Sequence, residues 1–558
     1  MGVSWIVKTA CFFCCFSLYP VEAPQMQFLL QVKKTPQAFE LYQEYQKERG
    51  MHDFALLKSL AIGVLEQGIQ SPYPEQQLLS LYGCSIAGLI DCLHIVEEGL
   101  KSDQLFVQLA SIQLLSALQD DRADRLLLKA MSSPFLIVRL EAAYHLAAKR
   151  HPKACGQIEA LMYKVPQEMH VLFPSLFALM PTKEANYLLK SLMSHRLSVV
   201  RISAIHAAAS MHREDLLPVI RAHLTHGGEA EKEACVAALG SFKDMLSKEK
   251  LVQMLKTSSP ALSLACAKAL HSLGDLSGLQ VIEEYALKKD VLALNLVPLL
   301  PHSAPLLYPL LKDSSLQVRW NAVLALLEMK DPACVEGLKE ILTQQFHDLS
   351  VIPTTSMGGS LQGWKLLSQT HQKLATSWGI NLDSLIHQVH LFLLQESMHL
   401  PEENFLDLAS YLLDHKQLSL VPTLVHLLEA QGSEGALTLL KKYAQMAGVP
   451  LVRNYATLAL YRLNKGEGLE KELYVWVKKS QGREILKIET ALPKTLTLFP
   501  QSSYELSPNE SSRLLIEIYQ AFATRREEKS IEALIEGLKS GNPFNRPALA
   551  GLLLFAVQ

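Results

Sequence analysis

The stretch Ser133-Pro-Phe-Leu-Ile-Val-Arg-Leu-Glu-Ala-Ala-Tyr-His-Leu146 decides the fold of this chain, because its pattern returns at a fixed interval. Its core is Val138-Arg139 with Ala142-Ala143, and a similar core, Val200-Arg201 with Ala204, returns two intervals further along the chain. Looser copies follow at Val318-Arg319 and Val452-Arg453. A period of about 31 residues is typical of stacked helical pairs, each burying its apolar face on its neighbours. The sequence therefore predicts an all-α solenoid.

The composition supports a stacked helical protein and argues against a nucleic-acid partner. Hydrophobic residues make up 49% of the 558 residues and charged residues 19%, against roughly 25% charged in ordinary domains. Lysine plus arginine number 53 and aspartate plus glutamate 55. A chain with this balance has no domain-scale basic field to hold nucleic acid.

A family resemblance becomes specific in two of the repeats. Val138 to Ala143 and Ala234-Cys-Val-Ala-Ala-Leu-Gly240 resemble the HEAT repeat of the phycobilisome-lyase-like type. The resemblance covers residues 100–345 well and 400–465 more loosely. It implies an α–α superhelix in which the second helix of each pair lines a concave face. It also implies a structural ladder of motif arginines along the stack, and the matching positions are Arg139, Arg201, Arg319 and Arg453.

The pattern divides the chain into six expected segments. They are a signal peptide (1–23), an N-terminal helical cap (24–99), a HEAT-repeat solenoid (100–345), an irregular insertion loop (346–381), a second HEAT-like helical block (382–480), and a C-terminal extended arm with capping helices (481–558). The insertion shows no helical pattern from Val351 to Ser360. It is interpreted either as an unstructured connection or as a functional loop.

The N-terminal segment, 1–23, has the features of a secretory signal. Lys8 precedes an apolar run from Thr9 to Leu18, and Val21-Glu22-Ala23 fits a cleavage site with small residues. The run is too short to span a bilayer as a helix, and the alternative is a buried N-terminal helix. We expect export, to the periplasm or the medium if the source is bacterial, a mature chain beginning near Pro24, and no transmembrane span in that mature chain.

The cysteines do not suggest a disulfide framework. Three of the nine lie in the expected signal, and the others are at positions 84, 92, 155, 235, 266 and 334. Cys84 and Cys92 would lie roughly 12 Å apart along one helix, which is too far for a disulfide. Small buried thiols are the favoured interpretation.

The sequence carries no convincing catalytic centre. Among HEAT folds, deoxyhypusine hydroxylase binds two irons through His-Glu dipeptides, and this chain contains no such dipeptide. We therefore expect no catalytic residues, no cofactor and no metal centre. The alternative is a metal- or tetrapyrrole-binding, lyase-like enzyme that uses the His195–His226 region. There His223, His226 and Glu229 are possible zinc ligands, although histidines at a helix end also cap carbonyl groups.

An apolar stripe is the candidate binding surface. Counting Val138 as zero, positions two, five and six of each motif helix are expected to face solvent on the concave side. The hypothetical partner-binding residues on this count are Leu109, Leu140, Tyr144, Ile202, Ile205 and Trp320. An exposed apolar stripe marks an interaction surface, whereas a shifted helix phase would make the same residues core. The resulting prediction is an exported scaffold that binds protein partners, of unknown identity, through its concave surface.

Overall fold

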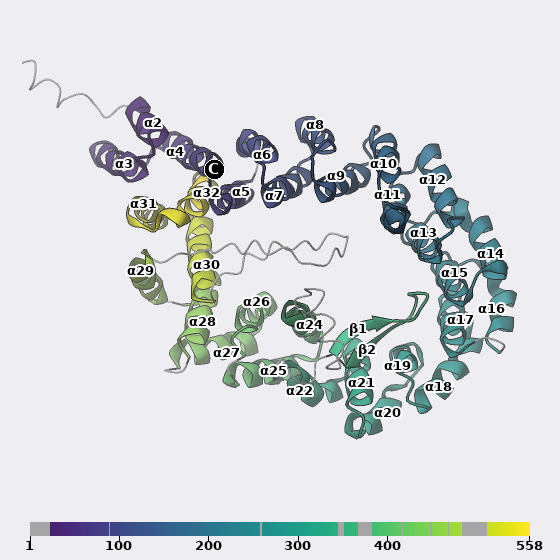
Figure 1. Ribbon diagram of the computed structural model, residues 1–558. Helices are drawn as coiled ribbons and strands as arrows, with labels where there is room; N and C mark the ends of the chain where they lie inside the picture. The colour runs from purple at the N-terminus through teal and green to yellow at the C-terminus, as the bar shows by residue number, and fades with distance from the viewer. Residues whose placement is uncertain are drawn as a thin grey trace, which may run out of the picture. The chain divides into compact units, whose positions relative to one another are not determined.

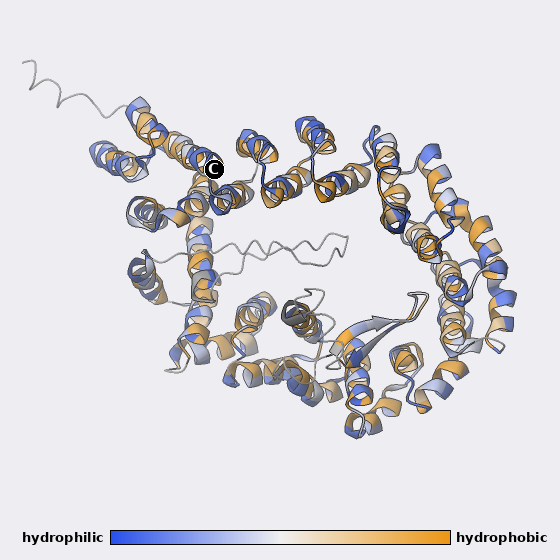
Figure 2. Ribbon diagram, viewed as in Figure 1, coloured by the Kyte–Doolittle hydropathy of each residue, from blue (hydrophilic) through white to orange (hydrophobic). Residues whose placement is uncertain are grey.

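The computed structural model describes residues 23–343, 351–366, 382–482 and 510–558, except residues 89, 257–258, 416, 447–448 and 467. These residues form a solenoid of stacked helices with one two-stranded sheet (Figure 1). The predicted fold class is confirmed. Hydrophobic and hydrophilic residues alternate along the helices (Figure 2), as expected where each helix has a packed side and a solvated side. Within the described ranges, no helix combines the length and the apolar character needed to cross a membrane.

The chain divides into two compact units, which do not coincide with the six expected segments. Unit 1 comprises Met1–Ala142, Tyr461–Ala491 and Pro500–Gln558, and the described part of unit 2 lies within Ala143–Leu460. Helices α9 (Leu136–Ala148) and α28 (Pro450–Arg462) run across the divisions. The expected signal peptide and extended arm fall almost wholly on residues 1–22 and 483–509, outside the described residues.

Unit 2 is built from helical pairs and short 3₁₀ turns. Its helices are α10 (Ala154–Met162), η3 (Gln167–Leu172), α11 (Phe173–Ala178), α12 (Lys183–Met193), α13 (Ser198–Ser210), η4 (Glu214–Leu216), α14 (Leu217–His226), α15 (Glu229–Ser241), η5 (Met245–Ser247), α16 (Lys248–Met254), α17 (Pro260–Ser272), η6 (Leu276–Gly278), α18 (Leu279–Leu287), α19 (Val291–Leu294), η7 (Val297–Leu299), α20 (Ala304–Leu307), η8 (Tyr308–Lys312), α21 (Leu316–Glu328), η9 (Pro332–Cys334), α22 (Val335–Thr343), α24 (Leu382–Ser397), α25 (Glu402–Asp414), α26 (Val421–Gln431) and α27 (Glu434–Gln445).

Within unit 2 the helices form an inner and an outer layer (Figure 1). We call α11, α13, α15, α17, α19 and α21 the inner layer, and α12, α14, α16, α18 and α20 the outer layer. Each inner helix packs on the next inner helix, and α13, α15 and α17 also pack on outer partners. Small residues allow the inner helices to approach closely, since a Cβ on Gly240 would lie 2.9 Å from the Cα of Ala269.

The repeat interval is visible in the turns that end the motif helices. Left-handed backbone conformations occur at Arg150, His212, Lys243, Gly274 and Lys330. The N–H of each following residue donates to the carbonyl five positions upstream, at 2.9 Å in all five turns. This hydrogen bond is the Schellman arrangement that terminates helices. The same turn therefore recurs at equivalent places, and the positions 212, 243 and 274 are separated by equal steps of 31.

The expected irregular insertion contains a β-hairpin. Strands β1 (Val351–Thr355) and β2 (Gln362–Leu366) pair in antiparallel register, with Val351 opposite Leu366 and Thr355 opposite Gln362. The residues between them form a tight turn in which Gly359 has a φ of 73°, a conformation that favours glycine. The expectation of an irregular loop is therefore wrong for residues 351–366.

Unit 1 joins the beginning and the end of the described chain. Its helices are α2 (Ala23–Gln31), α3 (Thr35–Arg49), α4 (Phe54–Ile69), α5 (Pro74–Ala87), η2 (Ile90–Cys92), α6 (Leu93–Leu100), α7 (Leu105–Ser116), α8 (Asp121–Ala130), α29 (Leu469–Ser480), α30 (Glu510–Arg525), α31 (Glu528–Ser540), η10 (Pro543–Asn545) and α32 (Arg546–Val557). Helix α32 packs on α4 and α5, and α31 packs on α3. The segments expected as two separate caps therefore share one core.

Two glycines bring α5 and α32 into backbone contact. A Cβ on Gly551 would lie 2.3 Å from the carbonyl oxygen of Gly83 and 2.5 Å from its Cα. A Cβ on Gly83 would in turn lie 2.4 Å from the carbonyl oxygen of Pro547. Helix α32 is buried along nearly its whole length, so its apolar sequence is explained by packing within unit 1.

The six cysteines of the described chain are buried and free, as the sequence predicts. The distance argument for one pair is wrong, however, because α5 ends at Ala87 and Cys92 belongs to a separate element, η2. The thiols of Cys84 and Cys92 are in hydrogen-bonding contact, and this contact together with burial raises the pKa of Cys84. The two cysteines do not lie on one continuous helix.

Candidate functional site

The predicted apolar stripe lies mostly in the core. Leu109, Leu140, Ile205 and Trp320 are buried, with exposed fractions between 0% and 6%, whereas Tyr144 and Ile202 are half-buried. The expectation that this stripe faces solvent is wrong for the four buried residues. The physical reason is the helix phase: an inner helix is covered by its outer partner and by both inner neighbours, which leaves only a narrow strip open.

Position six is accessible on α13 and α17, whereas position five is buried. The position-five residues are all buried: Ile112, Ala143, Pro174, Ile205, Val236, Ala267, Val323 and Thr457. Position six is His206 on α13 and Lys268 on α17, but Ala237 on α15 is half-buried and Leu324 on α21 is buried. The polar part of the accessible strip therefore lies on α13 and α17, and it carries the candidate site.

The motif arginines bind the turn that precedes their own helix. The Nη1 of Arg139, Arg201 and Arg319 donates to the carbonyl six positions upstream, at Ser133, His195 and Asp313. Arg201 also pairs with the buried carboxylate of Glu231 in the next repeat. Arg453, in the later block, is exposed. These contacts fix each turn against its helix, which is a structural role.

The histidines at 195–226 do not converge on one point. His223 and His226 lie in the last turn of α14, and Glu229 opens α15. In the described part of the chain, these three side chains do not form a cluster with metal-ligand spacing. Burial, with neighbouring His170 and arginines, lowers the pKa of His195. His206 points elsewhere, to the hairpin.

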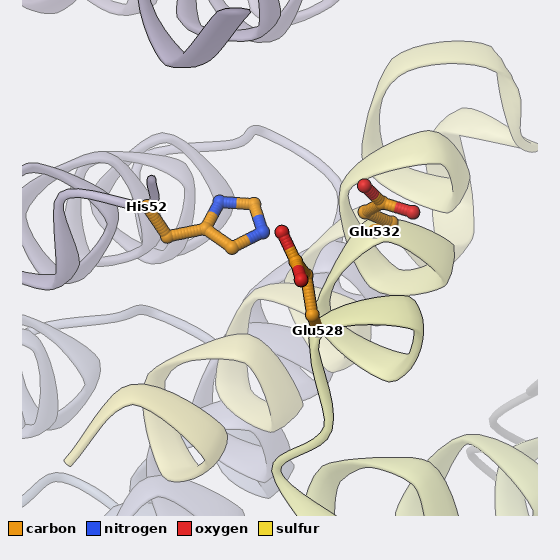
Figure 3. Close-up of side chains that lie close together, drawn as sticks. All are labelled: His52, Glu528 and Glu532. Atoms are coloured by element: carbon orange, nitrogen blue, oxygen red, sulfur yellow. The ribbon is translucent and has the colours of Figure 1, made fainter. Parts of the chain in front are cut away.

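One cluster with ligand spacing occurs in unit 1. His52, in the turn between α3 and α4, approaches Glu528 and Glu532, one turn apart on α31 (Figure 3). One ligand atom from each lies within 4.8 Å of the others, and no other group of three or more such residues has this spacing among the described residues. The His52 ring stacks on Tyr42, with its Nδ1 3.2 Å from the tyrosine hydroxyl.

The environment of His52 favours a structural role for this cluster. Burial lowers the pKa of His52, and the two carboxylates oppose that shift. Both carboxylates are exposed, and exposed acidic groups are common without an ion. The cluster therefore joins the α3–α4 turn to α31 as a polar contact within unit 1.

The turn of the hairpin binds a single carboxylate of the inner layer. Glu233 on α15 is 3% exposed. Its Oε2 accepts from the backbone N of Gly358 at 3.0 Å, and its Oε1 accepts from the backbone N of Ser360 at 3.2 Å. The hydroxyls of Ser356 and Ser360 also donate to Oε1. Hydrogen bonds to an ionised acceptor are stronger than neutral ones, so Glu233 anchors the turn.

Neighbouring helices complete the contact with the turn. His206 Nε2, on α13, lies 2.6 Å from the carbonyl oxygen of Gly358. Because that oxygen can only accept, Nε2 carries the proton. Lys268 Nζ, on α17, donates to the carbonyl of Ser360 at 3.4 Å. Three successive inner helices thus contact the same tight turn.

Glycine is required where the turn meets α15. A Cβ on Gly358 would lie 2.5 Å from the Cβ of Glu233 and 2.6 Å from the carbonyl oxygen of Ala230. Any side chain there would displace the turn from the helix. The Gly-Gly pair therefore serves both the turn geometry and the close approach.

The second strand of the hairpin is held through its backbone. The side-chain amide of Asn321 on α21 donates to the carbonyl of Trp364 at 2.8 Å and accepts from its N–H at 3.0 Å. Asn321 is fully buried, and the Asn295 amide donates to its Oδ1 at 2.7 Å. An adjacent strand would make the same pair of bonds to one residue's backbone, so Asn321 binds β2 through the backbone of Trp364.

Comparison with known proteins fits this architecture. Residues 318–344 match the PBS lyase HEAT-like repeat. This match spans α21, η9 and α22, and it confirms the repeat type that the sequence resemblance indicates. A comparison with curated proteins gives no significant match.

A comparison with known structures aligns this chain with an AP-3 complex and with a karyopherin. A homology model of the full-length AP-3 complex in an intermediate open conformation is 14% identical, with a TM-score of 0.30, covering 94% of this chain and 98% of that chain. The karyopherin Kap121p bound to the extreme C-terminus of the protein phosphatase Cdc14p is 10% identical (TM-score 0.29; coverage 95% and 54%). Kap121p bound to Pho4p is 12% identical (TM-score 0.29; coverage 97% and 67%).

Proposed function

We propose that this chain is a scaffold that binds protein partners through the inner layer of unit 2. The observation that supports the proposal is the way His206, Glu233 and Asn321 hold the backbone and hydroxyl groups of the hairpin. Curved helical stacks offer extended surfaces of this kind. The proposal assigns the chain no catalytic step, because the polar side chains of this site are engaged in holding polypeptide.

Site-specific photocrosslinking would test which face of unit 2 meets partners. A photoreactive residue replaces the exposed Lys268 of the inner layer, and a matched one replaces Tyr187, which is 74% exposed on the outer layer. We expect proteins from the source cells to crosslink at position 268 and not at 187. Equal crosslinking at both positions, or crosslinking at 187 alone, would contradict binding by the inner layer.

We further propose that the protein is exported. The support is the sequence alone: Lys8, the apolar run from Thr9 to Leu18, and Ala23 before the expected cleavage point. N-terminal sequencing of the protein purified from its source is expected to begin at Pro24 or Gln25. An intact Met1 or Gly2 would show that the segment is retained and that the export proposal is wrong.

A further inference from the structure

The hairpin turn contacts the inner layer through polar groups, and Leu361 next to the turn is buried. Met357, at the tip of the turn, is 92% exposed. The bonds that hold the turn run from its amides, hydroxyls and carbonyls to Glu233, His206 and Lys268. Another polar segment that offers the same groups can compete for these bonds, because each replaces a bond to water, and the bonds to Glu233 contribute the most.

The inner-layer side of the contact depends on an occupant. Glu233 is buried, and within the described residues no lysine or arginine forms an ion pair with it, so the hairpin turn supplies its hydrogen-bond donors. Asn321 also binds the backbone of Trp364, although it keeps its bonds to Asn295 and Gln317 without the hairpin. A buried carboxylate without partners is unfavourable. If the hairpin leaves, Glu233 therefore requires water or another segment of polypeptide.

The chemistry of an alternative occupant follows from the same contacts. It must bring amide and hydroxyl donors to Glu233, offer a carbonyl oxygen to His206, and have glycine where Gly358 now contacts α15. A side chain at the position of Gly358 would not fit against Ala230. A tight polypeptide turn rich in glycine and serine satisfies all three requirements.

We propose that residues 351–366 are an internal ligand of unit 2, and that a glycine- and serine-containing turn of a protein partner binds the His206–Glu233–Asn321 site in their place. This inference rests on the proposed scaffold function and adds its partner class. In the observed state, the chain occupies its own site, so a partner must compete with the hairpin.

The test uses the full-length protein and a fluorescent synthetic peptide of residues 351–366. Gly358→Ala places a Cβ against α15 and should release the internal turn. Gly156→Ala is the matched control, because a Cβ there would meet nothing within 4 Å. We expect the peptide to bind Gly358→Ala about ten-fold more tightly than the wild type or Gly156→Ala, as measured by fluorescence anisotropy.

A second substitution separates specific peptide binding from nonspecific binding. Adding Glu233→Ala to the Gly358→Ala chain should weaken peptide binding again by about ten-fold or more. A peptide carrying alanine at the position of Gly358 should bind as weakly. Equal affinity for all chains, or affinity that survives Glu233→Ala, would overturn the inference.

Folding of the variants is checked by circular dichroism melts. If Gly358→Ala does not fold, the double substitution Ser356→Ala and Ser360→Ala removes hydroxyl donors without adding bulk and serves the same purpose.

The experiments distinguish failure of the scaffold proposal from failure of the internal-ligand proposal. Crosslinked partners at position 268 without peptide binding would reject the internal ligand and leave the scaffold function. Peptide binding without crosslinked partners would reject the scaffold function, and with it the partner's turn, but would leave residues 351–366 as an internal ligand.

Discussion

Gly551→Ala is expected to lower the free energy of unfolding of unit 1 by about 3 kcal/mol, because overpacking at a backbone contact forces helices apart. The added methyl group would lie 2.3 Å from the carbonyl oxygen of Gly83 and 2.7 Å from its carbonyl carbon. Neither is the end of a flexible side chain that could move aside. Helix α32 would have to shift away from α5, and its contact with α4 would loosen as well.

Hydrogen exchange resolved along the chain would measure this effect where it arises. We expect faster exchange in α4, α5 and α32 of the variant, and unchanged exchange in α13 to α17 of unit 2. Gly482→Ala is the control in unit 1, since a Cβ there would meet nothing within 4 Å. Equal protection in the Gly551→Ala and Gly482→Ala chains would mean that the close approach of α5 and α32 is not present in solution.

The association of α5 and α32 illustrates what the sequence could not predict. The motif copies relate residues one or two intervals apart, and no pattern relates Gly83 to Gly551, which lie at opposite ends of the chain. Their contact depends on the course of the whole chain. The apolar run from Ala548 to Val557 could indicate that α32 is covered, but not by which helices.

The hairpin was predictable in part. The segment Val351-Ile-Pro-Thr-Thr355 is β-branched apart from its proline, and Gly358-Gly359 follows as a turn signal, a combination that indicates a hairpin with an edge strand. The sequence gives a weaker indication that the hairpin packs against α15. Glu233 is an acidic residue at a position that is apolar in most of the other repeats. Such a departure indicates a site, but the partner 123 to 127 residues away can be found only from the fold.

The main error in the sequence prediction was the rotation of the motif helices about their axes, which decides which positions of one helix are buried. Ile202 and Ile205 both belong to the predicted stripe, yet Ile205 is fully buried and Ile202 is half-buried. The repeat interval gives the spacing of the motif helices without giving their rotation. The rotation follows from packing on three sides of α13, by α12, α11 and α15. Because alanines are small enough to suit either side, the motif itself leaves the phase open.

Ile205→Ala is expected to lower the free energy of unfolding of unit 2 by about 3 kcal/mol, as typical for an isoleucine deleted from a core. Ile202→Ala, three positions earlier on the same helix, should cost about 1 kcal/mol, because less apolar area leaves contact with the protein. The two variants have the same composition and nearly the same helix propensity change, so the comparison isolates burial. Urea denaturation followed by circular dichroism measures both.

Ile205→Ala and Ile202→Ala also distinguish an effect on core packing from an effect on partner binding. Because Ile205 contributes to the core, its replacement should reduce crosslinking at position 268 only in proportion to the fraction of unit 2 that unfolds. Ile202 is half-buried, so its replacement should reduce partner capture by more than its small loss of stability explains. If Ile202→Ala instead proves the more destabilising of the two, α13 is rotated relative to the arrangement described above, and His206 no longer faces the hairpin.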